Sequence, residues 1–282
     1  MTSILEMVDV SFRYPGTSKE ALQQLNIRIP EKKKIAICGH NGSGKSTLFL
    51  HAIGIHPPSS GQVIWKNEPM SYKRRALQQL RQQVGLVFQD PEQQLILNTP
   101  YEDVSYGLRN AEVPEAEIKL RTDQILRTMR LDHLAHTPIH HLSLGQKKRV
   151  ALAGVLVLEP KLLLLDEPTA YLDRISEAQL VEELNRIHSQ GVTLVMATHD
   201  MNLAYAWADW LLVMDKGQCV MAGTPYEIFS RTEDIAALGL DKPMLLDIWQ
   251  ALPESVRQTV EPPRNIEAYK ALLQKSFAYL LV

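Results

Sequence analysis

Eight consecutive residues near the start of the chain have the types and the spacing that bind phosphate groups. Glycines let backbone N–H groups curl around phosphate oxygens, a lysine neutralises the outer phosphates, and a hydroxyl side chain reaches Mg²⁺. The pattern that combines these features is G-x-x-x-x-G-K-[ST]. This chain matches it with Gly39, His40, Asn41, Gly42, Ser43, Gly44, Lys45 and Ser46. The motif predicts that this loop, with Thr47 after it, holds the phosphates of a bound ligand.

A second chemical feature is a pair of neighbouring carboxylates. Asp166 and Glu167 follow the apolar run of residues 162–165. An aspartate at the end of a buried strand can bind Mg²⁺ beside the phosphates, and the next carboxylate can orient or deprotonate an attacking water. Adjacent carboxylates also occur in ordinary surface turns. Because the glycine loop is present in the same chain, we interpret Asp166 as a Mg²⁺ ligand and Glu167 as the base.

Between these two motifs lies the segment L-S-L-G-Q of residues 142–146, which allows two interpretations. By itself it is a helix capping box, with Ser143 as the N-cap and Gln146 three residues later. A helix N-terminus that carries a serine hydroxyl and a glycine, here Gly145, also forms an anion-binding site. The residue types alone leave both interpretations open.

Apolar runs along the chain indicate the elements that position these motifs. A strand, a glycine loop and a helix are expected at residues 34–38, 39–44 and 45–55, which is the order that a phosphate site needs. Short continuous apolar runs are typical of buried parallel strands, and helices between them provide the crossovers. The alternation therefore predicts an α/β fold. Further expected strands are residues 84–88, 162–165 and 192–197, and further expected helices are residues 114–130 and 143–158.

Antiparallel strands are expected before and after this core. Val8, Val10, Phe12 and Tyr14 alternate with polar residues, as in a half-exposed strand. Further expected elements are a strand containing Ile27 and Ile29, a hairpin of residues 211–214 and 219–221, and a short helix of residues 224–230.

Beyond residue 230 the pattern becomes helical only, so we place a domain boundary between residues 1–230 and residues 231–282. Two helices with apolar faces are predicted there. The first has Asp241 as its expected N-cap and presents Leu245, Ile248, Trp249 and Leu252. The second has Asn265 as its expected N-cap and presents Ile266, Tyr269, Leu273, Phe277 and Leu280.

The composition is that of an ordinary globular protein. The chain has 282 residues, 45% of them apolar, and a net charge of −2 from 30 basic and 32 acidic residues. These values exclude a disordered or fibrous chain. The basic runs at residues 32–34, 73–75 and 147–149 are scattered, so we interpret them as solvated turns and helix faces. We therefore expect no nucleic-acid partner.

The sequence predicts neither a membrane span nor a secretory signal. Apolar stretches such as residues 150–158 are far shorter than the roughly 18 residues that a membrane helix needs. Residues 1–10 carry no basic residue before their apolar positions. Two cysteines cannot build a disulfide framework. We interpret four closely spaced histidines as a helix end and a linker rather than a metal site: His133, His136, His140 and His141.

Six motifs in a fixed order resemble the nucleotide-binding subunit of ATP-binding cassette (ABC) transporters over about residues 4–230. The resemblance implies a P-loop NTPase cassette with a mixed-sheet core, an antiparallel β subdomain and an α-helical signature subdomain at about residues 95–158. A small C-terminal helical extension, residues 231–282, would follow the cassette. The six motifs are Tyr14, the glycine loop, Gln89, the signature at residues 142–146, the carboxylate pair and His199.

The resemblance also implies how the matched residues bind and hydrolyse ATP with Mg²⁺. Tyr14 would stack on adenine, with Phe12 as the alternative. Gln89 would touch Mg²⁺ and the attacking water, and His199 would contact the γ-phosphate. The expected site comprises the catalytic residues Lys45, Gln89, Glu167 and His199, the nucleotide-binding residues Tyr14, 39–47, Ser143, Gly145 and Gln146, and the Mg²⁺-binding residues Ser46, Gln89 and Asp166.

Two residues depart from the family pattern. Leu144 replaces the first glycine of the signature, and Tyr171 stands where the family usually has a small residue. Both positions lie at the subunit interface in the family, so the departures concern the turnover rate more than ATP binding. We expect Leu144 to be tolerated, because the phosphate contacts come from Ser143, Gly145 and the helix N-terminus.

A finer resemblance is to the ATPases of energy-coupling-factor (ECF) transporters, and especially to the cobalt or nickel branch. It rests on residues 89–94, on residues 101–104 and on residues 140–143 running into residues 146–151. Importers of vitamins or other micronutrients share most of these strings and remain the alternative. A soluble ABC protein acting on ribosomes or DNA would usually have two cassettes. A module that binds without hydrolysis is disfavoured by Glu167 and His199.

The resemblance implies partners as well. Two ATPase subunits would pair head to tail, either as a homodimer or with a paralogous ATPase subunit. Membrane partners would be an ECF transmembrane subunit and a substrate-binding membrane subunit, which places the chain peripherally on the cytoplasmic face of the cell membrane. The extension would keep the ATPase pair together, although its apolar faces could instead pack on the cassette. Cutting the chain after Ser230 is then expected to leave ATP binding unaltered.

Overall fold

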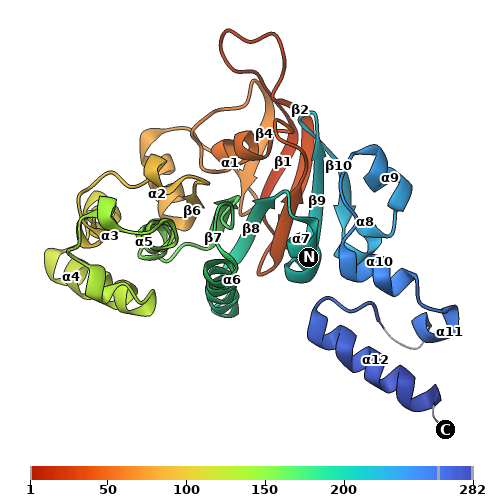
Figure 1. The fold of residues 1–282 in the computed structure, drawn as a ribbon. Coiled ribbons are helices and arrows are strands. Elements are labelled where there is room, and N and C mark those ends of the chain that lie inside the picture. The colour runs from red at the N-terminus through yellow and green to blue at the C-terminus, as the bar shows by residue number, and fades with distance from the viewer. Residues whose placement is uncertain (1, 259–260, 281–282) are drawn as a thin grey trace.

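Two sheets organise the chain in the computed structural model, which describes residues 2–258 and 261–280, with side chains as far as residue 274 (Figure 1). The larger sheet is mixed, in the order β10-β9-β3-β8-β7-β6. Its neighbouring strands are parallel except for the hairpin of β9 and β10. The strands are β3 Lys34–Cys38, β6 Val84–Val87, β7 Leu162–Asp166, β8 Thr193–Thr198, β9 Trp210–Asp215 and β10 Gln218–Gly223.

The smaller sheet is antiparallel, in the order β2-β1-β4-β5. The predicted alternation along β1 holds only in part, because Asp9 has a φ of 50° and the pairing register shifts between Met7 and Val10. A β-bulge of this kind puts one extra residue into the strand and changes which side chains face inward. Tyr14 lies beyond the end of β1. The strands are β1 Ser3–Phe12, β2 Leu22–Pro30, β4 Ser60–Trp65 and β5 Glu68–Pro69.

Helices lie around the mixed sheet (Figure 1). Three of them lie together beyond β6 and include the predicted signature helix, which is α5. The fold thus has the mixed core, the antiparallel sheet and the helical subdomain that the family resemblance implied. The helices are α1 Lys45–Ala52, α2 Arg74–Gln83, α3 Pro100–Asn110, α4 Glu115–Thr128, α5 Leu144–Leu156, α6 Arg174–Ser189 and α7 Met201–Trp207, with short 3₁₀ turns at Pro91–Gln93, Asp132–Leu134 and Ile139–His141.

The central strands supply side chains to two hydrophobic clusters. Along β3, Ile35 and Ile37 join a cluster with the antiparallel sheet and α1, whereas Ala36 and Cys38 join a cluster with the signature helices, α6 and α7. Successive side chains of a strand point to opposite faces, and both faces of this sheet are covered, so the strands are apolar throughout. Because β3, β6, β7 and β8 are parallel, their carboxyl ends share one edge, where the predicted site residues follow.

Among the residues that the structure describes, five further helices follow the hairpin: α8 Pro225–Phe229, α9 Thr232–Ala237, α10 Met244–Gln250, α11 Glu254–Arg257 and α12 Ile266–Leu280. Asn265 caps α12 as predicted, since its Oδ1 accepts from the Ala268 N–H at 2.8 Å. The prediction that Asp241 caps α10 is wrong, because α10 begins at Met244 with Pro243 as its N-cap. A residue before proline is disfavoured in the helical region, which prevents an earlier start.

The apolar faces of the C-terminal helices pack against the cassette. Leu246, Trp249, Tyr269 and Leu272 are buried in the cluster that contains Tyr205. The Arg264 guanidinium donates hydrogen bonds to the carbonyl oxygens of Tyr205 and Ala208 at the end of α7. The predicted faces are wrong in part, because Ile248 (44% exposed) and Ile266 (62% exposed) point away, whereas Leu246 and Leu272 are buried without having been predicted. Phe277 and Leu280 lie outside the described side chains.

Within the described ranges, the structure contains no helix with both the length and the hydrophobicity needed to cross a bilayer.

Candidate active site

The glycine loop connects β3 to α1 and is tightly confined. Gly39 has a φ of 152°, and a Cβ atom added there would lie 2.3 Å from the Met214 carbonyl oxygen of β9. Gly44 is the N-cap of α1 in the left-handed region, with a φ of 107°. Gly42 also has a positive φ, of 80°. Glycine adopts positive φ values without a steric cost, and an added Cβ would also clash at Gly39 and at Gly44, so the shape of the loop requires the glycines of the motif.

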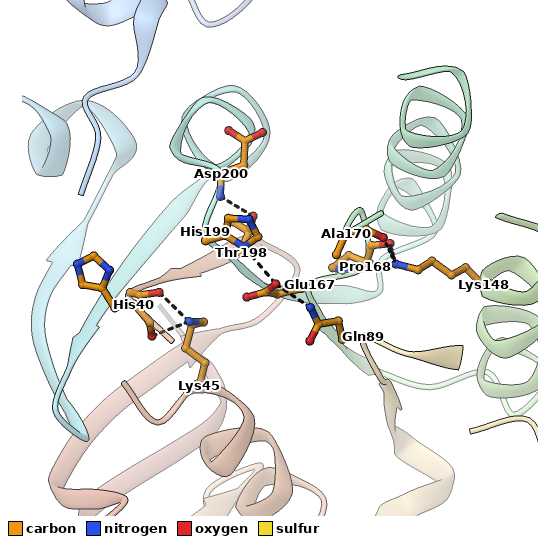
Figure 2. A network of polar contacts seen from close by, with 11 residues as sticks. His40, Lys45, Gln89, Lys148, Glu167, Pro168, Ala170, Thr198, His199 and Asp200 are labelled. Carbon is orange, nitrogen blue, oxygen red and sulfur yellow. Dashed lines mark hydrogen bonds and ion pairs between the residues drawn. The ribbon is translucent and has the colours of Figure 1, made fainter. Parts of the chain in front are cut away.

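The Lys45 ammonium lies inside the curve of this loop. Its Nζ donates to the Gly39 carbonyl at 2.7 Å and to the His40 carbonyl at 3.0 Å (Figure 2). Burial lowers the pKa of Lys45, while the carboxylates of Glu167 and Asp166 oppose that shift. The buried Ser43 hydroxyl has no hydrogen-bond partner among the residues that the structure describes. A concave loop with an inward cation and an unsatisfied hydroxyl is suited to an anionic ligand.

Asp166 ends β7 beside the start of α1. Burial raises the pKa of its carboxyl group, whereas a hydrogen bond from the Ser46 hydroxyl lowers it. The structure therefore brings together the two residues for which Mg²⁺ binding was predicted from different motifs. A hydroxyl and a carboxylate are oxygen ligands, the kind that Mg²⁺ prefers. Gln89, the third predicted ligand, follows β6 at the same sheet edge.

Glu167 is contacted by side chains from two neighbouring strand ends. Its Oε2 accepts a hydrogen bond from Gln89 Nε2 at 3.1 Å and lies 3.1 Å from His199 Nδ1 (Figure 2). Because a carboxylate only accepts, the contact with His199 requires a proton on Nδ1. Glu167 is 9% exposed, whereas the His199 side chain is 67% exposed. Three of the four predicted catalytic residues, Gln89, Glu167 and His199, thus form one polar cluster with an open side.

The backbone after Glu167 is held by a lysine that sequence reasoning missed. Lys148 Nζ, on α5, donates to the Pro168 carbonyl at 2.8 Å and to the Ala170 carbonyl at 2.7 Å (Figure 2). Lys148 is 4% exposed, so the interpretation of residues 147–149 as a solvated basic run is wrong at this position.

Burial lowers the pKa of Lys148 to about 8, although the negative charges of Asp90 and Glu167 act in the opposite direction. The helical spacing of the sequence could have indicated that Lys148 is buried. Residues four apart lie on the same helix face, and Leu152, four residues after Lys148, is buried.

The signature residues form the predicted capping box. The Gln146 N–H donates to the Ser143 Oγ at 3.3 Å, and the Gln146 Oε1 accepts from the Ser143 N–H at 2.8 Å. Ser143, Gly145 and Gln146 line a small cavity with Leu172 and Ser176. The glycine loop of the same chain contributes no residue to this cavity. The structure therefore places the signature and the phosphate loop of one chain at separate sites.

Gln94 is a second residue whose position the sequence did not predict. Its Oε1 accepts from the Phe88 N–H at 3.1 Å, and its Nε2 donates to the Ala151 carbonyl at 3.0 Å. Gln94 therefore joins the end of β6, where Gln89 follows, to the signature helix α5.

The structure distinguishes the two aromatic candidates for an adenine contact. The Tyr14 hydroxyl forms a hydrogen bond with Thr47 Oγ1 at 3.2 Å, and the Tyr14 ring is half-buried. Phe12 is 8% exposed because the rings of Tyr14 and His56, each 5.0 Å away between centroids, cover it. Of these two residues, Tyr14 is the more accessible, and it lies beside Thr47 at the end of the phosphate loop.

The four histidines at positions 133–141 lie on the segment that joins α4 to α5 and contains two 3₁₀ turns. The rings of His140 and His141 contact each other edge to face at 4.3 Å, and His136 packs beside Tyr101. Within the described part of the chain, no three side chains of the metal-binding types gather around a common point.

Comparisons with known proteins identify the family of this chain. Residues 22–170 match the protein family described as ABC transporter. An energy-coupling factor transporter ATP-binding protein of Clostridium perfringens is 40% identical over 89% of this chain and 88% of its own. A cobalt import ATP-binding protein of Salmonella paratyphi A is 42% identical over 87% of this chain and 90% of its own.

A solved structure is similar to this chain over most of its length. It is cbiO1 of Clostridium perfringens, described as part of the ABC transporter complex cbiONQ. It superimposes with a TM-score of 0.74 at 41% sequence identity, covering 85% of this chain and 95% of the solved one.

Proposed function

This chain belongs to the ABC transporter family of ATP-binding subunits, and from that premise we propose that it powers an ECF-type importer of cobalt or nickel. The observation that carries the proposal is the cluster in which Gln89 and His199 both contact Glu167 beside the Lys45 loop. Such a cluster positions a carboxylate next to bound phosphates, as ATP hydrolysis requires. The similarity to a cobalt import ATP-binding protein supports cobalt as the first solute to test.

The phosphate loop would bind ATP through its backbone N–H groups and through Lys45. On binding, the Lys45 ammonium would exchange its contacts with the Gly39 and His40 carbonyls for phosphate oxygens. The unsatisfied Ser43 hydroxyl is a further donor for the phosphates. Tyr14, which is half-buried beside Thr47, would stack on the adenine.

The residues around Asp166 fit a magnesium ion. Ser46, Asp166 and Gln89 offer a hydroxyl, a carboxylate and an amide oxygen at one edge of the sheet, which is a hard oxygen ligand set. A cation beside Asp166 would also offset the burial that raises the pKa of its carboxyl group. When bound, Mg²⁺ would neutralise charge on the β- and γ-phosphates.

Glu167 would act on the attacking water, and His199 would stabilise the γ-phosphate. Glu167 is buried on one side and held by Gln89, so its second oxygen can accept a proton from a water in a fixed direction. His199 can turn its exposed ring toward a phosphate without leaving the cluster. Developing negative charge on the transferring phosphoryl group favours such nearby donors.

A partner ATPase subunit would complete the site. Ser143, Gly145 and Gln146 lie apart from the glycine loop of their own chain, which supports a head-to-tail pair in which they reach the partner's nucleotide. Tyr171 is 84% exposed and Leu144 is 36% exposed, as interface residues are before association. The partner is a second copy of this chain or a paralogous ATPase subunit.

The two parts of the chain would have different tasks in this assembly. Residues 1–230 form the cassette, with the signature subdomain at about residues 95–158, and residues 231–282 form the extension that holds the ATPase pair together. The exposed side chains of Met244 and Ile248 support that role, because packing within the chain leaves them uncovered. The membrane partners would be an ECF transmembrane subunit and a substrate-binding subunit, contacted from the cytoplasmic face of the membrane.

The substitution Glu167→Gln tests the proposal. The variant is expected to bind ATP like the parent and to form an ATP-stabilised dimer, because Lys45 and Ser46 are intact. Its ATPase rate is expected to fall by about two to four orders of magnitude without the base. The measurements are ATPase activity, size-exclusion chromatography with Mg-ATP, and uptake of radioactive cobalt by cells that also express the membrane subunits.

The matched control is Glu159→Gln, which changes an exposed glutamate paired with Arg121, away from the cluster. It is expected to leave all three measurements at parental levels. Turnover by Glu167→Gln at the parental rate, with no dimer in ATP, would contradict the assignment of Glu167. Uptake of a vitamin rather than of cobalt or nickel would contradict the assignment of the solute alone.

A further inference from the structure

The side chain of His40 leaves the phosphate loop and reaches a residue 198 positions later in the chain. Its Nε2 atom lies 2.5 Å from the carbonyl oxygen of Leu238, directly after α9. Because a carbonyl oxygen only accepts, the His40 ring carries its proton on Nε2 and donates. Figure 2 shows the His40 ring turned away from Glu167. The contact joins the phosphate loop to the segment beyond the predicted cassette boundary.

The end of α9 has a backbone geometry that exposes this carbonyl group. Leu238 is the C-cap residue. The Gly239 N–H donates to the Ala236 carbonyl at 2.9 Å, and the Leu240 N–H donates to the Ile235 carbonyl at 3.0 Å. These two bonds form a Schellman motif. The last carbonyl groups of a helix have no partner within it, and for Leu238 that partner is His40.

Gly239 is required at this position for two reasons. Its φ is +65°, in the left-handed region that favours glycine. A Cβ atom added there would lie 3.0 Å from His40 Nε2 and 3.4 Å from the neighbouring ring carbon Cε1. A larger residue would therefore press against the His40 ring at the atom that makes the hydrogen bond.

Both ends of this contact are anchored. On one side, Ile235 of α9 is 1% exposed and lies in the same hydrophobic cluster as Phe229. On the other side, the His40 carbonyl accepts hydrogen bonds from Lys45 Nζ at 3.0 Å and from the Ser43 N–H at 3.1 Å. A displacement of His40 would therefore move the groups that shape the phosphate loop.

We propose that residues 231–240 are a positioning element of the nucleotide site, and that the hydrogen bond from His40 to Leu238 holds the phosphate loop in the curvature that accepts phosphates. The inference rests on the proposed function, because it concerns the same loop. It gives the extension a task inside one subunit, separate from association between subunits. It also replaces the expectation that the chain binds ATP equally well without residues 231–282.

The test compares two glycine substitutions in the full-length protein. Gly239→Ala strains a helix end and displaces the His40 ring. Gly191→Ala places the same strain at the end of α6, at a φ of +90°, where an added Cβ meets nothing within 4 Å. The measurement is the Kd for a fluorescent ATP analogue with Mg²⁺. Gly239→Ala is expected to raise the Kd by about threefold to tenfold, the equivalent of one hydrogen bond, and Gly191→Ala is expected to leave it unchanged.

Variants of His40 complete the experiment. His40→Ala is expected to raise the Kd as Gly239→Ala does, and Gly239→Ala added to His40→Ala is expected to have no further effect, because both remove one contact. His40→Gln keeps an N–H donor and is expected to bind within about twofold of the parent. If Gly239→Ala fails to fold in a thermal scan, the comparison of His40→Ala with His40→Gln decides.

The outcomes separate this inference from the proposed function. Equal Kd values for Gly239→Ala and Gly191→Ala, or a full effect of Gly239→Ala in the His40→Ala background, would overturn the inference alone. A Kd for His40→Gln as high as that for His40→Ala would also overturn it. A parent protein that does not bind the analogue would overturn the proposed function and this inference together.

Discussion

Lys148 supports backbone that is in an unfavourable conformation. Glu167 has a φ of 44° and Tyr171 has a φ of 63°, and both are left-handed conformations that cost energy for residues with a side chain. The two carbonyl groups that Lys148 binds, those of Pro168 and Ala170, lie between them. The Lys148 ammonium therefore stabilises the turn that presents Glu167 to the site. A neutral residue at position 148 would remove both charge-assisted hydrogen bonds.

The lowered pKa of Lys148 predicts how stability depends on pH. The folded chain releases this proton at about pH 8, whereas an unfolded chain keeps it up to about pH 10.5. Between these values the unfolded chain binds more protons, so raising the pH favours folding as far as this group is concerned. The free-energy cost of burying the Lys148 ammonium is fully present below about pH 8 and becomes smaller as the pH rises above that value.

Comparing the parent with Lys148→Met isolates this effect. The variant lacks the titrating amine, and the other ionisable groups are the same in both proteins. The free energy of unfolding of the parent, relative to Lys148→Met, is expected to increase between pH 8 and pH 10 by at most about 1.4 kcal/mol per pH unit. Urea unfolding of both proteins at several pH values measures it. Parallel curves would show that Lys148 does not titrate in this window.

At the scale of elements, the N-terminus of α5 is the part of the signature with a defined structural role. Ser143 and Gln146 satisfy two backbone N–H groups there, whereas the Leu144 side chain is partly exposed. Ser143→Arg would lose the cap, at a cost of about 1 kcal/mol in helix stability, and would put a bulky side chain where the partner's phosphate is proposed to bind. Leu144→Gly changes neither the cap nor the hydroxyl.

We therefore expect Ser143→Arg to lower the ATPase rate by at least about tenfold, the scale on which single contacts to a transition state act. Leu144→Gly is expected to stay within a few-fold of the parent. Steady-state ATPase assays of both variants provide the comparison. Near-parental ATPase rates in both variants would show that the signature takes no part in hydrolysis.

Whether an element could be predicted from the sequence depends on how its residues are buried. The strands of the mixed sheet are apolar on both faces, so residues 162–165 and 192–197 stood out, and the residues that end parallel strands had to share one edge. Strand β4 begins with three exposed residues and could not be recognised from apolar spacing. The hydrogen bond from His40 to Leu238 joins segments 198 residues apart, and no local pattern records it.

At the scale of the whole molecule, the extension has one face packed on the cassette and another uncovered. Because Ile248 is 44% exposed, Ile248→Glu is expected to leave the fold intact. It is expected to weaken association of nucleotide-free subunits by about tenfold or more, since a charge would enter an apolar contact. Analytical ultracentrifugation without ATP measures the oligomeric state. Glu254→Gln, an exposed change on α11, serves as the control.

An unchanged oligomeric state in Ile248→Glu would limit the extension to packing within its own subunit. The proposed role of residues 231–240 at the phosphate loop would be unaffected by that outcome.

The alternation of side chains along β3 has a consequence for how the protein melts. Ile35 and Ile37 belong to one hydrophobic cluster, and Ala36 and Cys38 belong to the other, which also contains Leu246 of the extension. Each cluster takes every second residue of β3, so disorder of this strand would disrupt both clusters at once. We therefore expect the core of the mixed sheet and the packing of the C-terminal helices to be lost together when β3 unfolds, on both sides of the predicted boundary.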